Sequence, residues 1–403
     1  MNFPSTNPIS KDAFANAVIK AIKDAGETQT LRYDAEGFCI VIEEDGADLL
    51  NLGNAYGEYC GAAPEIRDGI VQRFVRVWFA RNSEVPDDYQ TAAPHLLPAV
   101  RNRGYFEMTK LELERRGIDR PDFPLTILAE HFAVGLVYDL PESIHQIQPS
   151  YLETWQVSFE EASIRARANL VAISQEKLGS IIPGVWQSPW RDNHDSARML
   201  LHEYLRQHQV HGDLVVMIPN RDTLLLTGAD DETGLSAIAA LAEEALQGPR
   251  PMNGIALRLD GDAWVPFMPA PEHPDFAKYQ LMWVQAIGQD YEEQKELLND
   301  IYETKDEDIF VASFSARQDQ ETGEVRSYSV WSKDVVSLLP RTDEVFFFVA
   351  DGENIGEAVA RANWSRVVEV AGALLKAKGW YPERYYVDQF PSTAQIELLR
   401  VEE

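Results

Sequence analysis

Cysteine is scarce in this chain of 403 residues, which contains only Cys39 and Cys60. A disulfide framework needs several cysteines, and a cysteine-based zinc site needs closely spaced groups of Cys and His, so the sequence excludes both. We expect the two thiols to be small buried side chains. Because free thiols persist in reducing compartments, the sequence favours a cytoplasmic protein.

Long apolar runs are also absent. No run reaches the roughly 18 consecutive apolar residues that a membrane-spanning helix requires, so we expect no membrane partner. The stretch from Met1 to Pro8 contains no cationic region and no apolar core. No signal peptide is therefore predicted there.

Positive charge is the third deficit, since 36 Lys and Arg residues stand against 65 Asp and Glu residues and the formal net charge is −29. A nucleic-acid-binding protein must neutralise phosphates with a basic face, and none is evident, so nucleic acid is excluded as a partner. Anionic membrane surfaces are disfavoured for the same reason. The 45% hydrophobic and 10% aromatic content is nevertheless typical of a folded globular protein.

The acidity is densest between Asp290 and Asp308, where nine carboxylates stand against two lysines. Leu297, Leu298 and Ile301 recur there at helical spacing, which predicts a helix with one apolar strip and an acidic face. Two interpretations stay open. The segment is either a solvated linker helix or a docking surface for a basic protein partner, because a field of one sign steers association.

Recognised chemical motifs are missing as well. The chain has no phosphate-binding glycine loop, dinucleotide fingerprint, serine-hydrolase elbow, zincin motif or calcium loop. Four histidines fall within one short stretch: His194, His202, His208 and His211. On a helix, His194 and His202 would be too far apart for one metal ion, whereas His208 and His211 would meet if the helix continued through them. We expect no metal and no cofactor, and the sequence favours a protein that is not an enzyme.

Hydrophobic periodicity predicts the main elements of the N-terminal half. A capping box at Ser158 and Glu161 starts one helix, and Asp195 is a suitable N-cap for another. Three helices are expected over about 10–25, 61–80 and 158–170, and a fourth begins at Asp195. The expected strands cover 31–33, 38–42 and 132–138.

An internal repeat is the most informative feature. Residues 216–226 and 337–347 align at an offset of 121 without a gap. The identical pairs are Pro219/Pro340, Asp222/Asp343, Ala229/Ala350 and Asp230/Asp351. A proline presets the turn and an aspartate caps it, which gives the Pro-x-x-Asp pattern a structural reason.

Each copy is followed by a predicted helix and then by two predicted strands. The strands cover 255–259 and 264–267 after the first copy, and 385–387 and 395–399 after the second. The sequence therefore predicts an α+β fold, with antiparallel sheets, helices packed on one face, and a duplicated strand-strand-helix-strand-strand unit. The predicted regions are an N-terminal α+β region (1–180), a first module (181–270), an acidic linker helix (271–308) and a second, diverged module (309–403).

Several stretches resemble a known family. They are Leu96 to Arg101, Leu136 to Asp139, Trp155 with Ser158, Glu161 and Asn169-Leu170, Asp195 to Leu200, and Asp213 to Asp222. In these the chain resembles the bacterial family catalogued as domain of unknown function 1444, over about residues 10–270. The resemblance implies no activity, cofactor or catalytic residue, because the family is uncharacterised. Residues from 271 onward form an extension beyond it.

Candidate binding residues come from two patterns. Trp and Arg are enriched at binding hot spots, which favours the loop around Trp186 and Trp190, although these rings could simply cover the edge of a core. Carboxylates and arginines could also converge in an unrecognised site. The candidates are Trp186, Trp190, Arg191, Asp195, Arg198, Arg221, Asp222, Asp230 and Asp343.

These observations favour a non-catalytic protein-interaction or regulatory protein. Two alternatives remain: an enzyme with an unrecognised carboxylate and arginine site, or an immunity-like inhibitor of a basic partner. The sequence does not predict the oligomeric state.

Overall fold

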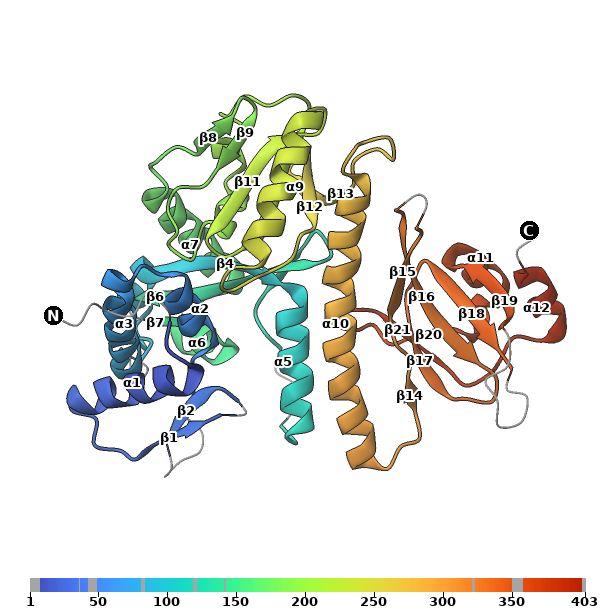
Figure 1. Ribbon diagram of the computed structural model, residues 1–403, viewed down its shortest axis with the longest axis horizontal. Helices are drawn as coiled ribbons and strands as arrows, with labels where there is room; N and C mark the ends of the chain where they lie inside the picture. The colour runs from blue at the N-terminus through green and yellow to red at the C-terminus, as the bar shows by residue number, and fades with distance from the viewer. Residues whose placement is uncertain are drawn as a thin grey trace. The chain divides into compact units, whose positions relative to one another are not determined.

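The computed structural model describes residues 8–35, 37–42, 49–80, 84–118, 122–140, 143–320, 323–349 and 358–400. The predicted α+β class is confirmed (Figure 1). The chain forms two compact units, each assembled from separate stretches: unit 1 from Met1–Ala99, Gly135–Gln175 and Glu244–Pro251, and unit 2 from the remainder. The division into four consecutive regions that the sequence predicts stays a prediction.

Unit 1 begins with the predicted helix and hairpin. Ser10 caps α1 (Lys11–Asp24) by accepting from the amide of Ala13, and Phe14, Val18 and Ile22 are buried. The hairpin forms an antiparallel sheet with a third strand: β1 (Leu31–Asp34), β2 (Cys39–Ile42) and β3 (Leu49–Asn51). Three helices follow: α2 (Gly53–Gly61), η1 (Pro64–Ile66) and α3 (Arg67–Ala80).

A second group of elements in unit 1 surrounds Trp155. The predicted cap at Ser158 is present, because its hydroxyl accepts from the amide of Glu161 at the start of α7 (Phe159–Ile173). Asn169 of α7 donates to the carbonyls of Ala93 and Leu96. Neighbouring elements are α4 (Tyr89–Ala92), η2 (Ala93–His95), β7 (Ser143–Gln146) and α6 (Pro149–Trp155), and β4 (Leu96–Asn102) and β6 (Phe132–Leu140) run through both units.

Unit 2 contains a six-stranded antiparallel sheet of order β13-β12-β10-β11-β9-β8. The first predicted strand-strand-helix-strand-strand unit lies here: β10 (Leu214–Asn220), β11 (Thr223–Gly228), α9 (Glu232–Leu246), β12 (Ala256–Asp260) and β13 (Ala263–Phe267). The other two strands are β8 (Gly179–Ile182) and β9 (Val185–Gln187).

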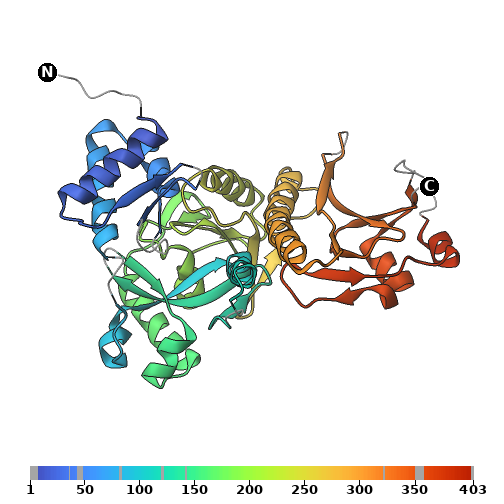
Figure 2. The same cartoon turned by 90° about the horizontal axis from the view of Figure 1, so that it is seen from below.

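Two helices of unit 2 lie side by side, α5 (Arg103–Arg115) and the 30-residue α10 (Phe276–Lys305) (Figures 1 and 2). A helix is present within the predicted region 271–308, and the acidic stretch that begins at Asp290 occupies its second half and continues past its end at Lys305. Its expected apolar strip is present, since Leu298 and Ile301 are buried against Met108 and Leu111 of α5. The strand β5 (Thr126–Leu128) pairs with β6.

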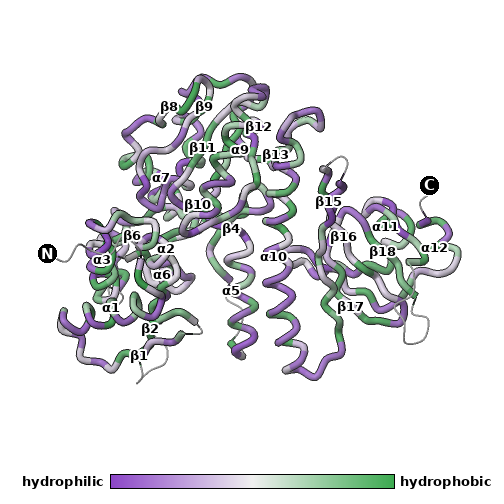
Figure 3. The backbone as a smooth tube through the Cα atoms, in the orientation of Figure 1, coloured by the Kyte–Doolittle hydropathy of each residue, from purple (hydrophilic) through white to green (hydrophobic). Residues whose placement is uncertain are grey.

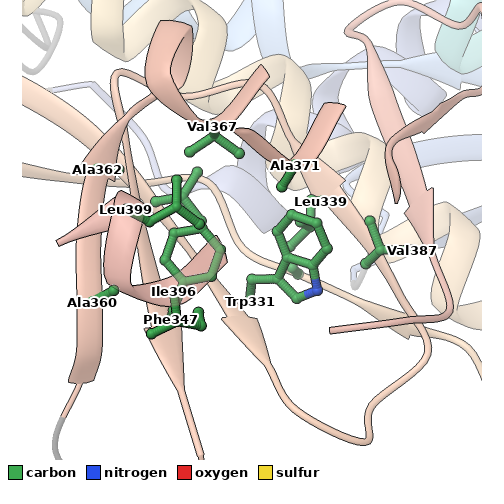
Figure 4. Packing of buried hydrophobic residues seen from close by; sticks show 12 residues of the cluster. Trp331, Leu339, Phe347, Ala360, Ala362, Val367, Ala371, Val387, Ile396 and Leu399 are labelled. Atoms are coloured by element: carbon green, nitrogen blue, oxygen red, sulfur yellow. The ribbon is translucent and has the colours of Figure 1, made fainter. Parts of the chain in front are cut away.

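Two further sheets of unit 2 share a core with short helices. One has the order β14-β17-β21-β20 and the other β15-β16-β18-β19. Trp331 and Phe347 lie at the centre of this core, packed beneath α11 (Trp364–Ala371) and α12 (Thr393–Leu399) (Figure 4). The strands are β14 (Phe310–Val311), β15 (Ser315–Gln318), β16 (Val325–Ser332), β17 (Ser337–Pro340), β18 (Glu344–Phe348), β19 (Ala358–Asn363), β20 (Lys376–Ala377) and β21 (Arg384–Val387), with η4 (Gly372–Leu374) after α11.

The second copy of the predicted duplication does not form the expected unit. β17 and β18 belong to different sheets, each contains a parallel pair, and β19 intervenes before α11. The predicted strand 395–399 is wrong, because Ser392 and Gln395 form a capping box that starts α12 there. Ala350 and Asp351 lie outside the described residues.

The helix predicted from Asp195 is also wrong in form. Asp195 has helical backbone angles and makes no side-chain cap, so η3 (Ser196–Leu200) and the single turn α8 (His202–Leu205) replace one continuous helix. In the described part of the chain, no helix combines the length and apolar content that crossing a bilayer requires. Along α10, hydrophilic and hydrophobic residues alternate (Figure 3).

Candidate functional site

The sequence-predicted residues are only partly brought together. Arg198 is fully buried, donates to both carboxylate oxygens of Asp192 at 2.8 and 2.7 Å, and lies 3.9 Å from the ring centroid of Trp190. The carboxylate of Asp195 accepts from the amide of Asp192. Because burial disfavours its charged form, the pKa of Asp195 is raised.

The other predicted residues have separate surroundings. The carboxylate of Asp222 accepts from the backbone amide of Asn193, and the backbone carbonyl of Arg221 accepts from the backbone amide of Ser196, so both hold the loop that precedes η3. Trp186 belongs to β9 and donates to the carbonyl of Gln209. Three predicted residues are exposed: Arg191, Asp230 and Asp343.

A cavity of about 520 Å³ in unit 2 has the features of a ligand site. Residues far apart in sequence line it: Arg103 from the start of α5, His131 from the β5–β6 loop, Arg341 from the β17–β18 turn, and Tyr381 from the segment before β21. Further aromatic side chains complete the lining: Trp283, Tyr291, Phe314, Trp380 and Tyr385. Of the sequence-predicted residues, only Asp343 lines this cavity.

Three titratable side chains form a hydrogen-bonded row at the cavity wall. The hydroxyl of Tyr381 lies 3.0 Å from Nδ1 of His131 and 3.0 Å from Oδ2 of Asp290. His131 and Tyr381 are each 6% exposed, and Asp290 on α10 lies behind Tyr381. The guanidinium of Arg103 stacks 4.6 Å from the centroid of the Tyr381 ring.

Local backbone features place these groups. Gly104 lies against Asp290 so closely that a Cβ there would approach Oδ1 to 2.2 Å, so only glycine fits. The residues before His131, Ala129 and Glu130, both have positive φ, at 48° and 64°. These two residues form the tight turn of the β5–β6 hairpin, which places His131 just before β6.

The surroundings shift the pKa values of the row in opposite directions. Burial raises the pKa of Asp290 to about 7, so this carboxyl gains or loses its proton near neutrality. Burial lowers the pKa of His131 to about 4, with Arg103 and Arg341 acting in the same direction against Glu130. Burial and the charge of Asp290 raise the pKa of Tyr381, which remains protonated. Groups with such shifts in a cavity are typical of functional sites.

The row can transmit a change of protonation. When Asp290 is ionised, Tyr381 donates to it and accepts from Nδ1–H of His131, which leaves Nε2 as an acceptor. Protonation of Asp290 at Oδ2 reverses both hydrogen bonds, and Nε2 then carries the proton. Nε2 is buried and has no hydrogen-bond partner among the described residues.

The two arginines at the cavity are electrostatically available. In the described parts of the chain, no carboxylate lies within ion-pair distance of Arg103 or Arg341; Nη1 of Arg103 donates to the backbone carbonyl of Glu130 at 3.3 Å, and its buried Nε has no hydrogen-bond partner. Three carboxylates line the cavity: Asp343 accepts from Ser327, Glu383 accepts from two backbone amides, and the negative charge of Glu130 acts on His131 and Tyr381. The guanidinium groups of Arg103 and Arg341 can hold an anionic group at the part of the cavity that they line, against the opposing charge of Glu130.

Sequence reasoning missed this site because its members are separated by up to hundreds of residues. Of the residues that line the cavity, the sequence indicated only Asp343 as a candidate. It did so because Asp343 belongs to the internal repeat, not because of its place in the cavity. The burial of His131 and its hydrogen bond with the hydroxyl of Tyr381 are signals that only a structure supplies.

No group of His, Cys, Asp and Glu in the described ranges has the geometry to hold a metal ion. No family model, curated protein or solved structure matches the chain. The resemblance to domain of unknown function 1444 therefore stays a prediction.

Proposed function

We propose that this chain is a non-catalytic, regulatory binding protein that takes a small anionic molecule, such as a carboxylate or phosphate compound, into the Arg103–Tyr381 cavity. One observation carries the proposal: Arg103 and Arg341, both without a carboxylate partner in the described residues, line one cavity and act on the same His131. Guanidinium groups match the geometry of carboxylates and phosphates. The aromatic lining would pack against the rest of the molecule.

The test is thermal unfolding of the full chain with orthophosphate, succinate and AMP as probes. We expect at least one probe to raise the unfolding midpoint, and expect Arg103→Gln and Arg341→Gln each to reduce that rise, because ligand binding to the folded state stabilises it. Arg115→Gln on the far part of α5 is a matched control that should keep the rise. If no probe acts, or if the control loses the rise equally, the proposal fails.

The enzyme alternative is separable by product analysis. A binding protein returns the probe unchanged after prolonged incubation, whereas acid–base chemistry by the His131–Tyr381–Asp290 row would convert it. Conversion that Asp290→Asn abolishes would replace the non-catalytic proposal with an enzymatic one.

Binding of a basic protein partner remains a prediction, and so does the alternative in which this chain is an immunity-like inhibitor of that partner. Its support is that Glu292, Glu296 and Asp300 of α10 are exposed. A reducing cytoplasm remains our proposed location, because Cys39 and Cys60 are both free thiols.

A further inference from the structure

The sheet β15-β16-β18-β19 in unit 2 has two unlike faces. Burial alternates along β16, with Val325, Ser327, Ser329 and Trp331 buried. Trp331 belongs to the face that α11 and α12 cover (Figure 4). The opposite face carries the residues that alternate with these, and it is independent of the cavity.

The opposite face combines arginines with aromatic rings. We call it the arginine face, and it consists of Arg317, Arg326, Tyr328, Glu344, Phe346 and Arg361. Strand register sets them together, since Arg317 pairs with Arg326, Tyr328 with Glu344, and Phe346 with Arg361. Tyr328 and Phe346 are only half-buried and meet edge to face at 5.4 Å.

Three guanidinium groups share one carboxylate on this face. Glu344 is 4% exposed and contacts Arg317 at 2.9 Å, Arg326 at 3.5 Å, and Arg361. Burial raises the pKa of Glu344, but the hydrogen bonds and charges of Arg361 and Arg317 outweigh it and keep the pKa below its usual value. Glu344 is therefore ionised at neutral pH.

Positive charge remains after this pairing. Among the described residues, the carboxylates within ion-pair distance of the three arginines are Glu344 and Glu324, so one positive charge is left over. The arginine side chains stay 41–47% exposed. Arg317 and Arg326 are like charges directly opposite on neighbouring strands and repel one another, and their shared partner Glu344 offsets this repulsion.

We propose that the arginine face docks an extended acidic segment of a partner protein. Carboxylates of the partner would accept from Arg317, Arg326 and Arg361, and an apolar side chain would rest on Tyr328 and Phe346. Arginine and tyrosine are enriched at the energetic centres of protein interfaces. A protein segment fits better than nucleic acid, because a long polyphosphate would extend beyond this patch over a chain of net charge −29.

The experiment measures fluorescence anisotropy of labelled peptides with the full chain. The acidic probe is three repeats of Val-Glu-Glu, its neutral counterpart is three repeats of Val-Gln-Gln, and a labelled oligo-thymidine represents nucleic acid. We expect the acidic probe to bind with a Kd below ~1 mM and to weaken with added salt, whereas the neutral probe does not bind.

Two double variants with the same change in net charge test whether the acidic probe binds at the arginine face. The variant Arg317→Gln with Arg326→Gln keeps the contact between Arg361 and Glu344. We expect it to lower the affinity for the acidic probe about tenfold, because two charge-assisted contacts are lost. Arg366→Gln with Arg400→Gln, on α11 and just after α12 over the covered face, should leave affinity within about twofold. If the first variant does not fold, Tyr328→Ser takes its place, with the same expected direction.

The proposal is overturned if the acidic probe fails to bind, if the neutral probe binds equally, or if both double variants weaken binding alike. Tighter binding of the oligo-thymidine with the same arginine dependence would overturn the choice of a protein partner and assign the face to nucleic acid.

Discussion

At the scale of single residues, Asp290 sets a pH dependence on stability. Its pKa is raised to about 7 in the folded state, so the folded protein holds a proton that the unfolded chain releases. The contribution of Asp290 to the free energy of unfolding is therefore present at about pH 4 and falls, by at most ~1.4 kcal/mol per pH unit, as the pH rises to about 7. His131 acts in the opposite sense. Its pKa is lowered from 6.5 to about 4 in the folded state, so its contribution to the free energy of unfolding falls as the pH drops from about 6.5 toward 4.

Asp290→Asn isolates the Asp290 contribution, because Asn keeps an acceptor for Tyr381 and has no charge to bury. We expect the variant to gain stability relative to the original chain as the pH rises from 5 to 8, measured by urea unfolding at each pH. Asp308→Asn, at an exposed position beyond α10, provides the control with the same charge change. A stability difference for Asp290→Asn that stays constant over this pH range would contradict the raised pKa.

At the scale of elements, Arg384 joins several strands and α10. It is fully buried and donates to the side chain of Gln294 at 2.6 Å and to the carbonyls of Tyr291, Ala312 and Leu338 at 2.7–3.1 Å. Burial lowers the pKa of Arg384 to about 10, so it stays charged at neutral pH.

Replacing Arg384 leaves these buried acceptors unsatisfied. We expect Arg384→Met to lower the free energy of unfolding by about 3–5 kcal/mol in urea unfolding, and Arg384→Lys to restore only part of it, because an ammonium cannot reproduce the planar fork. Arg366→Met, at the half-buried face of α11, should cost less than ~1 kcal/mol. A loss below ~1 kcal/mol for Arg384→Met would show that these hydrogen bonds do not hold the elements together.

At the scale of the whole molecule, local patterns predicted local structure. The first helix, the β1–β2 hairpin and the succession of β10, β11, α9, β12 and β13 along the chain follow from spacing and turn residues within short windows. The same reasoning failed at residues 395–399, although the Ser392 and Gln395 capping box was available in the sequence. The cavity could not be predicted, because α5, the β5–β6 loop, α10 and the segment before β21 meet only through long-range packing.

The most direct test of the proposed function is a crystal structure of the full chain soaked with the probe that stabilises it most. The account predicts density for the anionic group inside the cavity, within hydrogen-bond distance of the guanidinium of Arg103 or Arg341. An empty cavity, or the probe bound only elsewhere on the chain, would contradict it.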